Sequence, residues 1–450
     1  MTSSTLSLRQ DALSIFQAGI DAADPYQAVK NSLTLVDNHL EIALDLADRS
    51  KKRCGKWSQI HLIAFGKAAC KMIMAAEEII PEHLLANKPL AITNVENVIA
   101  LKNIEVLGAN HPIPDSAGRE AAEYLANKLK QTKTGELVLV LISGGGSALI
   151  PYPVDGITLE DKQLTTDLLL ASGASIQQIN CVRKHLSQLK GGQLAQLATP
   201  ADCHALILSD VIGDDLSSIA SGPTVPDNTT FADAIEILKS KNIWAKTPLT
   251  VQDVLKLGQH ETPKTGDPCF NNSSHTLVGS NSISLNAVSS ATKRLGYITH
   301  CFNNAITGEA RDIADQLVLA AKQHANTGLS QAVALIAGGE STVTLKGTGR
   351  GGRNQEMALA FAIAAEKQHL KAQWVFLSGG TDGLDGPTDA AGGLVDHETM
   401  LRLKNKHISP EQKLNNNDSY SALKESKDLI ITGATGTNVA DLQILLIQPE

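Results

Sequence analysis

The segment LVLVLISGGGSAL (137–149) joins a six-residue apolar run to a turn with three consecutive glycines. An apolar run of this length, bounded by turn residues, is typical of a strand buried on both faces of a parallel sheet. The same order of apolar run, polar or glycine-rich turn and helical pattern recurs along the chain. The other runs are IHLIAF (60–65), HALILS (204–209), TLVGS (276–280), AVALIA (332–337), WVFLSG (374–379) and DLIITG (428–433).

Short apolar runs that alternate with helical patterns of 10–15 residues indicate βαβ units and a parallel sheet. We therefore predict an α/β fold with two doubly wound, Rossmann-like domains. In open sheets of this kind, ligands bind beyond the carboxyl ends of the strands. Because each polar or glycine-rich turn follows an apolar run, we expect all of them at that edge, and we look for the functional site there.

The length of 450 residues suggests two domains, with three as the alternative. Residues 241–274 are rich in Pro, Gly, Asn, Ser and charge, which is typical of an interdomain connection. We therefore predict an N-terminal domain over residues 1–255 and a C-terminal domain over 256–450. Periodic apolar positions over residues 8–50 predict a pair of helices that covers one face of a sheet.

Composition excludes several classes of protein. The formal net charge of −8 argues against a nucleic-acid-binding protein or an anionic membrane surface as a partner. No stretch of 18 apolar residues and no signal-peptide pattern is present, so we expect neither a membrane span nor secretion. The six cysteines show no C-x-x-C spacing, which predicts reduced thiols in the cytoplasm.

The loop GTGRGGRNQE (347–356) carries four glycines and two arginines. We expect a strand to end near Lys346 and a helix to begin near Asn354. Glycines and a helix N-terminus would let backbone amides approach an anion, here at Gly351 and Gly352. Arg350 and Arg353 add fork-shaped donors suited to phosphate or carboxylate. The alternative is a surface turn with two solvated arginines.

The same loop satisfies the dinucleotide pattern G-x-G-x-x-G at Gly347, Gly349 and Gly352. That pattern also requires an acidic residue about 20 positions further on. The next acidic residue that ends a strand is Asp382, 30 positions past Gly352. The match to a nicotinamide-dinucleotide site is therefore weak.

Two further turns are candidates for phosphate binding. The first is uncharged and allows close backbone approach at Ser143, Gly144, Gly145, Gly146 and Ser147. It is not a P-loop, because G-x-x-x-x-G-K-[ST] does not occur, and a plain tight turn is the alternative. The second places Lys67 at a strand-to-helix junction, where its ammonium group could reach a phosphate or simply be solvated.

Two acidic turns offer carboxylates for a metal. Asp210, Asp214 and Asp215 follow one apolar run, and Asp382, Asp385 and Asp389 follow another. A magnesium site for phosphoryl transfer needs only one or two carboxylates besides the phosphate oxygens. At least half of these residues are expected to be turn formers and helix caps. Together with the lysine and the arginines, the turns fit phosphoryl transfer.

The ordered motifs of the chain resemble those of the class II glycerate 2-kinases, whose members combine a DUF4147 region with a MOFRL region and sometimes carry the label hydroxypyruvate reductase. The resemblance runs from about residue 10 to 445. It is carried by GKAA (66–69), NHPIPD (110–115), LISGGGSAL (141–149), RKHLSQLKGGQLA (183–195), LSDVIGDDLSSIASGPTVPD (208–227), GGEST (338–342), GRGGRNQE (349–356), LSGGTDGLDGPTDAAGG (377–393) and TGATGTNVADLQI (432–444).

This resemblance implies two α/β domains with the active site in the cleft between them, and the substrates ATP and D-glycerate with Mg²⁺. It places the family's active-site lysine on Lys67 and its arginine on Arg353. It also implies that the turn 143–147 contacts nucleotide phosphates and that Asp210 and Asp382 bind metal or substrate. It does not decide between a monomer and a homo-oligomer.

In the expected mechanism the 2-hydroxyl of glycerate attacks the γ-phosphoryl group while Arg353 and Lys67 neutralise its charge. Asp210 is the candidate acceptor for the hydroxyl proton. An NAD(P)H-dependent hydroxypyruvate reductase is the first alternative. A phosphosugar-binding protein without catalysis is the second.

Overall fold

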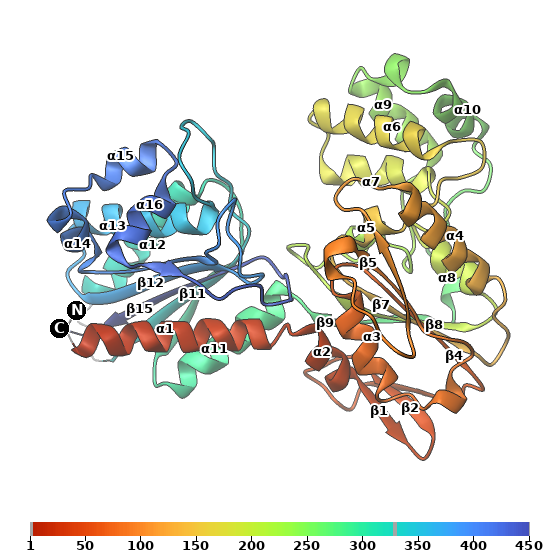
Figure 1. The fold of residues 1–450 in the computed structure, drawn as a ribbon, viewed down its shortest axis with the longest axis horizontal. Coiled ribbons are helices and arrows are strands. Elements are labelled where there is room, and N and C mark those ends of the chain that lie inside the picture. The colour runs from red at the N-terminus through yellow and green to blue at the C-terminus, as the bar shows by residue number, and fades with distance from the viewer. Residues whose placement is uncertain (1–2, 327–330, 450) are drawn as a thin grey trace. The chain divides into compact units, whose positions relative to one another are not determined.

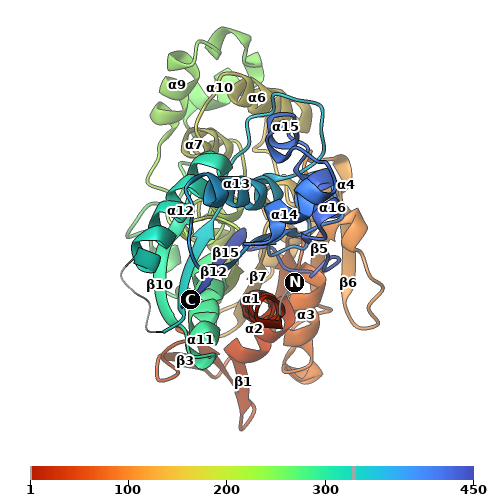
Figure 2. The same ribbon diagram turned by 90° about the vertical axis from the view of Figure 1, so that its left-hand side faces the viewer.

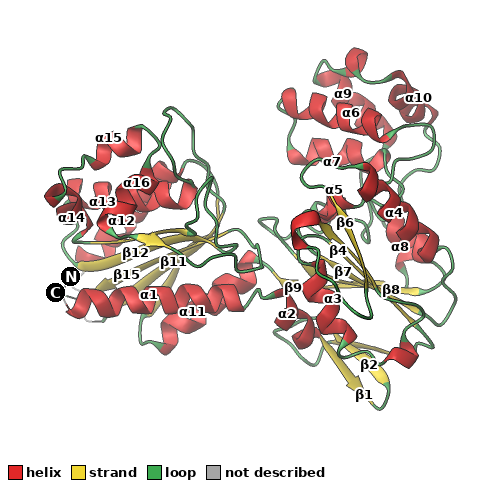
Figure 3. Cartoon of the chain, in the orientation of Figure 1, coloured by secondary structure: helices red, strands yellow, loops and turns green. Residues whose placement is uncertain are grey.

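The computed structural model describes residues 3–326 and 331–449. The chain forms two compact units, Pro25–Val278 and Met1–Asp24 with Gly279–Glu450. Both are α/β, as predicted, and Figures 1 and 3 show a sheet with helices in each unit. The units differ from the predicted domains in two ways. The first helix belongs with the C-terminal residues, and residues 256–278 belong with the N-terminal unit.

The unit 25–278 is built on a six-stranded sheet with the order β6-β5-β4-β7-β8-β9. Its pairs β6–β5, β5–β4, β4–β7 and β7–β8 are all parallel. The strands are β4 (Ile60–Phe65), β5 (Leu90–Asn94), β6 (Glu105–Ala109), β7 (Leu137–Ile142), β8 (Asp202–Leu208) and β9 (Ser273–Gly279).

Every residue of β4 and β7 is buried, because helices cover both faces of this sheet. Helices α4 and α8 pack on one face through alanines and leucines, and α3 packs against β4, β5 and β7. The helices are α2 (Pro25–Ser32), α3 (Ala69–Glu77), α4 (Ser116–Leu129), α5 (Gly146–Leu149), α6 (Leu159–Ala171), α7 (Ile176–His185), α8 (Gln193–Ala198), α9 (Phe231–Ser240) and α10 (Leu249–Leu257).

Local sequence explains where several of these helices begin. The Asp115 carboxylate accepts the amide of Gly118 at 2.9 Å and caps α4. Helices α6, α7 and α9 each begin with a reciprocal capping box, in which a Ser or Thr side chain and the side chain three residues later exchange hydrogen bonds with the backbone. Figure 3 shows α10 beside these three helices, and apolar side chains from the four helices form a cluster of their own.

Two expectations for this unit are wrong. A pair of helices was predicted over residues 8–50, but residues 33–55 form a three-stranded antiparallel sheet of β1 (Leu33–Val36), β2 (His39–Ala43) and β3 (Lys52–Gly55). Asp37 and Asn38 both adopt positive φ, the requirement of a tight two-residue hairpin. The expected interdomain connection at 241–274 contains α10, whose Val251 and Leu255 are buried within the unit.

The C-terminal unit has a mixed six-stranded sheet with the order β10-β11-β15-β12-β13-β14. Strands β10 and β11 pair in parallel, β15 runs antiparallel between β11 and β12, and the pairs β12–β13 and β13–β14 are also antiparallel. The run DLIITG gives only a two-residue strand, and the central β15 was not anticipated. The strands are β10 (Ile298–Ile306), β11 (Val333–Gly339), β12 (Gln373–Gly380), β13 (Gly392–Asp396), β14 (Leu429–Ile430) and β15 (Asp441–Gln448).

Helices cover both faces of this sheet as well. Apolar residues of α1 (Ser3–Asp21) and α11 (Asn281–Arg294) form one core with the sheet, and α12 (Ala310–Asn326) and α13 (Arg353–Lys367) form the other. Figures 1 and 2 show α1 and α11 side by side on their face. The shorter helices are α14 (Thr399–Asn405), α15 (Pro410–Asn415) and α16 (Ser419–Ser426).

Candidate functional site

The strand order in the unit 25–278 reverses between β4 and β7. In chain order its strands lie as 3-2-1-4-5-6, the arrangement of dinucleotide-binding sheets, and the connections diverge where the first and fourth strands meet. The turn after β4 carries Gly66 and Lys67, and the turn after β7 carries residues 143–147. Two of the predicted site segments therefore flank the position where open α/β sheets bind ligands.

Backbone contacts hold these two turns together. The Lys67 amide donates to the carbonyl of Gly144 at 2.9 Å, and the Ala68 amide donates to the hydroxyl of Ser143 at 3.0 Å. Gly66 has φ +118°, and a Cβ there would overlap Ser143. The Lys67 side chain itself is exposed. Its backbone is thus fixed at the turn while its ammonium group is accessible to a ligand.

Asp210 lies against the same turn. It follows β8, and a Cβ on Gly144 would overlap its carboxylate oxygen Oδ2. Glycine at position 144 is therefore what permits the carboxylate to approach the turn. The structure brings Lys67, the turn 143–147 and Asp210 together. Asp215, by contrast, accepts the hydroxyls of Ser217 and Ser218 and acts as a local turn former.

His111 is a further side chain at this turn, and it lies within the motif NHPIPD (110–115). A Cβ on Gly145 would lie 3.0 Å from His111 Nε2 and 3.3 Å from Lys67 Cγ. Burial lowers the pKa of His111, and the charge of Lys67 lowers it further. A neutral imidazole next to the lysine could donate or accept a hydrogen bond near neutral pH.

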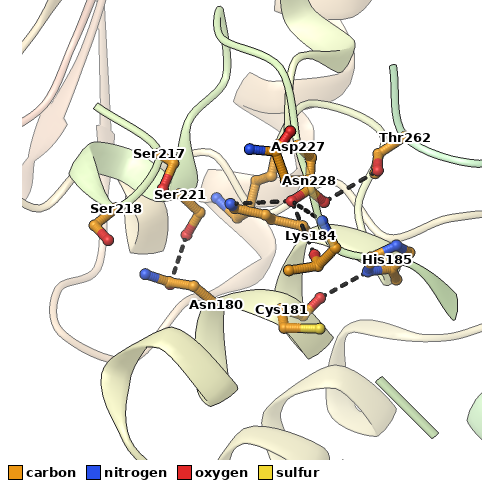
Figure 4. Close-up of polar contacts among 12 residues, drawn as sticks. Asn180, Cys181, Lys184, His185, Ser217, Ser218, Ser221, Asp227, Asn228 and Thr262 are labelled. Carbon is orange, nitrogen blue, oxygen red and sulfur yellow. Dashed lines mark hydrogen bonds and ion pairs between the residues drawn. The ribbon is translucent and has the colours of Figure 1, made fainter. Parts of the chain in front are cut away.

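Figure 4 shows that polar residues of the motifs 183–195 and 208–227 bind each other. Lys184 Nζ lies 3.3 Å from Asp227 Oδ1, and the Thr262 hydroxyl donates to Asp227 Oδ2 at 3.0 Å. The Ser221 hydroxyl donates to Asn180 Oδ1 at 3.1 Å. These contacts tie α7 to the long loop after β8. They give this part of the two motifs a structural role.

In the C-terminal unit, Arg353 is the first residue of α13 and donates to two acids. Its Nε and Nη2 bind the two carboxylate oxygens of Asp441 at 2.6 and 2.9 Å, and its Nη1 binds Glu340 at 2.7 Å. Burial alone would lower the pKa of Arg353, but the hydrogen bonds and charge of Asp441 raise it. Asp441 is fully buried, and sequence reasoning missed it although it lies within the motif 432–444.

The glycines of the loop 347–352 serve packing within the chain. A Cβ on Gly351 would overlap Ser419, and one on Gly352 would overlap Asp385. Amides of residues 346–350 donate to the segment Asn416–Asp418. These glycines thus let the loop approach other segments of the protein closely. Contact between a phosphate and Gly351 or Gly352 stays a prediction.

Asp385 occupies the N-terminus of α13. Its carboxylate accepts the amides of Asn354 at 3.1 Å and Gln355 at 2.8 Å. Burial raises the pKa of Asp385 to about 6, and the two amide hydrogen bonds act in the opposite direction. The first turn of α13 therefore has an internal anion, so that Arg353, rather than these amides, is the group available to a ligand.

The expected strand near Lys346 is absent. Strand β11 ends at Gly339, and residues 343–352 have neither helix nor strand. The G-x-G-x-x-G pattern requires a strand that leads directly into the glycine turn. The match at Gly347–Gly352 therefore lacks the structural context of a dinucleotide site.

Asp382 follows β12 in a tight turn and is half-buried, with Oδ1 accepting the amide of Leu384 at 3.0 Å. A Cβ on Gly380 would lie 3.2 Å from this oxygen and 3.6 Å from Asp441 Oδ1. The described residues contain no group of three or more His, Cys, Asp or Glu side chains arranged to hold a metal ion. One or two carboxylates suffice for Mg²⁺ that arrives with nucleotide phosphates, so Asp382 and Asp210 fit that use.

Residues 11–256 match the family model described as a domain of unknown function, DUF4147, and residues 333–441 match the MOFRL family. No helix in the described part of the chain is long and apolar enough to cross a membrane.

Several proteins are similar to this chain over nearly their full length. The chain is 40% identical to a glycerate 2-kinase of Pyrococcus horikoshii, covering 98% of each chain, and 40% identical to a D-glycerate 2-kinase of Thermotoga maritima, covering 98% of this chain and 99% of the relative. A putative hydroxypyruvate reductase of Agrobacterium vitis is 39% identical, with 99% and 96% covered. A crystal structure of a glycerate kinase from Thermotoga maritima superposes with a TM-score of 0.87 at 38% identity, covering 98% of this chain and 99% of that one. With a DUF4147 segment followed by a MOFRL segment and these full-length relatives, the chain belongs to the glycerate 2-kinase family.

Proposed function

We propose that this protein transfers the γ-phosphoryl group of ATP to the 2-hydroxyl of D-glycerate, giving 2-phosphoglycerate and ADP. The observation that carries the proposal is the meeting of Lys67, the turn 143–147 and Asp210 where the strand order of the sheet reverses. The names of the full-length relatives supply the substrate and the position of phosphorylation.

In the proposed reaction a bond forms between the glycerate 2-oxygen and Pγ while the bond from Pγ to the β,γ-bridging oxygen breaks. ADP leaves with the electron pair, and Asp210 accepts the proton of the attacking hydroxyl. Lys67 and Arg353 neutralise the negative charge that spreads over the transferred group. The turn 143–147 positions the nucleotide phosphates through its backbone.

Magnesium completes the proposed site. When bound, the ion would offset the negative charge of the nucleotide phosphates. The residues that would hold it are Asp210 and Asp382, each a half-buried carboxylate that follows a strand. Carboxylate oxygens are the ligands that Mg²⁺ prefers.

The name of the Agrobacterium vitis relative makes NAD(P)H-dependent reduction of hydroxypyruvate the competing function. The two activities are separated by incubating the purified protein with D-glycerate and MgATP, without nicotinamide cofactor, and identifying the product by phosphorus NMR. A 2-phosphoglycerate resonance with equal ADP supports the kinase. A 3-phosphoglycerate resonance contradicts the position of transfer. Folded protein that forms no phosphoglycerate but oxidises NADH with hydroxypyruvate would overturn the kinase proposal.

A further inference from the structure

Three cationic side chains gather next to Ser147, and the proposed reaction uses none of them. Lys162 lies on α6, Arg183 on α7 and Lys190 in the loop after α7. Lys190 is fully buried and donates to the carbonyl oxygen of Ser147 at 2.9 Å. Arg183 reaches the same oxygen at 3.5 Å. We call this group, with the space that Lys162 and Arg183 line, the cation pocket.

No acid neutralises the cation pocket in the part of the chain that the structure describes. The charged groups that act on the two lysines are the other cations of the pocket. Burial and the charge of Arg183 lower the pKa of Lys162 to about 7, and burial with both neighbours lowers the pKa of Lys190 well below its usual value. Like charges gathered away from water destabilise a fold unless an anion joins them.

Among the residues of the cation pocket, Lys162 gives the clearest indication that a ligand is missing. It is 5% exposed, and its Nζ is buried without a hydrogen-bond partner in the protein. A lysine ammonium group has three donors, and a buried donor without an acceptor costs about 1–3 kcal/mol. The nearby Lys184, which is equally buried, has Asp227 as its partner. Because Lys162 is also one of the residues that line a cavity, its unpaired ammonium group indicates a missing acceptor.

The cavity in front of Lys162 and Arg183 has a volume of about 380 Å³, which is in the range of small-molecule sites. It is also lined by Ser147 and by apolar residues such as Ile113 and Ile179. Its one acidic lining residue, Asp167, is exposed. Through Ser147 the cavity adjoins the turn 143–147, which we call the phosphate turn. A ligand there would lie next to the proposed site of phosphoryl transfer.

We propose that the cation pocket binds the carboxylate group of the acceptor hydroxy acid, D-glycerate, with Lys162 and Arg183 as its donors. This inference rests on the proposed kinase function. A carboxylate fits better than a nucleotide phosphate, because nucleotide phosphates arrive with Mg²⁺ and need a carboxylate nearby. Asp210 provides that carboxylate next to Gly144, whereas the pocket holds cations and suits an anion without a metal.

The test is Lys162→Met, which removes the charge but keeps a similar length. We expect the KM for D-glycerate, and its Kd measured by calorimetry without nucleotide, to rise at least about tenfold, since a lost charge-assisted hydrogen bond is worth about 1.5–3 kcal/mol. The KM for ATP should change by less than about twofold. The melting temperature should stay equal or rise, because a buried unpaired cation has been removed.

Lys184→Met is the matched control. It removes a lysine that is equally buried but paired. We therefore expect a lower melting temperature, because buried Asp227 loses the cation that pairs with it, and D-glycerate binding close to that of the wild type. The inference is overturned if Lys162→Met binds D-glycerate like the wild type, or if only its KM for ATP rises. If the wild type binds D-glycerate through Lys162 but forms no phosphoglycerate, the pocket stands and the kinase proposal fails.

Discussion

Arg353 binds both carboxylate oxygens of Asp441, at 2.6 and 2.9 Å, and so joins the start of α13 to the start of β15. Strand β15 begins where β11 and β12 end, and Asp441 pairs with both Gly339 and Gly380. Burial raises the pKa of Asp441, and the hydrogen bonds from Arg353 lower it. Asp441 holds one edge of the guanidinium group and Glu340 binds Nη1, while the Arg353 side chain is still 33% exposed, so the group is oriented before any ligand arrives.

Loss of this orientation should reduce turnover. In Asp441→Asn the amide cannot accept two hydrogen bonds in the same geometry, and we expect kcat to fall by about tenfold to a hundredfold with little change in the KM for D-glycerate. Arg353→Ala should lower kcat by on the order of 10³-fold, as for other arginines that stabilise a phosphoryl transition state. Steady-state kinetics with both substrates varied is the measurement.

Arg350→Ala provides the comparison within the same loop. Arg350 donates to the carbonyl of Pro387 at 3.1 Å and lies over the ring of Tyr420, so its contacts are structural. We expect a loss of less than about tenfold in kcat. Near-normal kcat in Arg353→Ala, or an equal loss in Arg350→Ala, would show that Arg353 has no special part in the reaction.

Local sequence patterns identified Arg353 as a candidate site residue but did not identify its partner Asp441. Arg353 follows a glycine-rich loop at a helix start, a combination that is visible in the sequence. Asp441 lies 88 positions away, and its place depends on β15 inserting antiparallel between β11 and β12. Strand direction and order arise from tertiary pairing, which apolar runs do not specify. The parallel unit was easier to predict, because its apolar runs are buried on both faces and alternate with helices.

Gly144→Ala tests the proposed role of Asp210. The new Cβ would overlap the Asp210 carboxylate and displace it from the phosphate turn. We expect kcat/KM to fall at least about a hundredfold, because misplacing a reacting group by about 1 Å can have that effect. The melting temperature should change little, since the carboxylate can move toward solvent.

Gly135→Ala is the control, because it should affect stability and leave the site intact. Gly135 has φ +83° and open space around it, so an added methyl group strains the backbone without touching the site. It should lose about 1 kcal/mol or more of stability and keep wild-type activity. Normal kcat/KM in Gly144→Ala would mean that the position of Asp210 does not matter for catalysis.

Arg9 connects α1 to the C-terminal unit through two buried acids. It binds Asp428 at 2.9 Å and also Asp396, and Arg402 binds the same two carboxylates. In Arg9→Ala these acids keep only one cation, and we expect a loss of about 3–5 kcal/mol in the free energy of unfolding. Chemical denaturation monitored by circular dichroism measures this loss. Lys30→Ala, which breaks an exposed pair with Glu78, should cost less than about 1 kcal/mol.

The same contacts explain why the first helix was placed in the wrong unit. Periodicity predicted that α1 covers a sheet, and it does, through Leu8, Ile15 and Phe16. It did not reveal which sheet, because the partner residues lie more than 250 positions further along the chain. A stable Arg9→Ala variant would contradict the conclusion that α1 is an integral part of the C-terminal unit.

The low pKa of Lys162, about 7, makes stability depend on pH. The unfolded chain keeps this proton up to the ordinary lysine value of 10.5, so between about pH 7 and 10.5 the unfolded state binds more protons. Stability from this residue therefore rises with pH across that window. The cations facing Lys162 are Arg183 and Lys190. The other charged groups of α6 and of the adjacent α10, which the substitution of Lys162 leaves unchanged, are Glu160, Asp161, Asp167, Asp253 and Lys256.

Lys162→Met removes this proton exchange and leaves the other groups in place. We expect the variant to exceed the wild type in urea midpoint at about pH 7, and the difference to shrink as the pH rises to about 9.5, where the native lysine is already neutral. A difference that stays constant with pH would mean that Lys162 titrates normally in the folded protein. In that case the side chain would have to be solvated or paired, and the cation pocket would lose the unpaired buried charge on which its ligand was inferred.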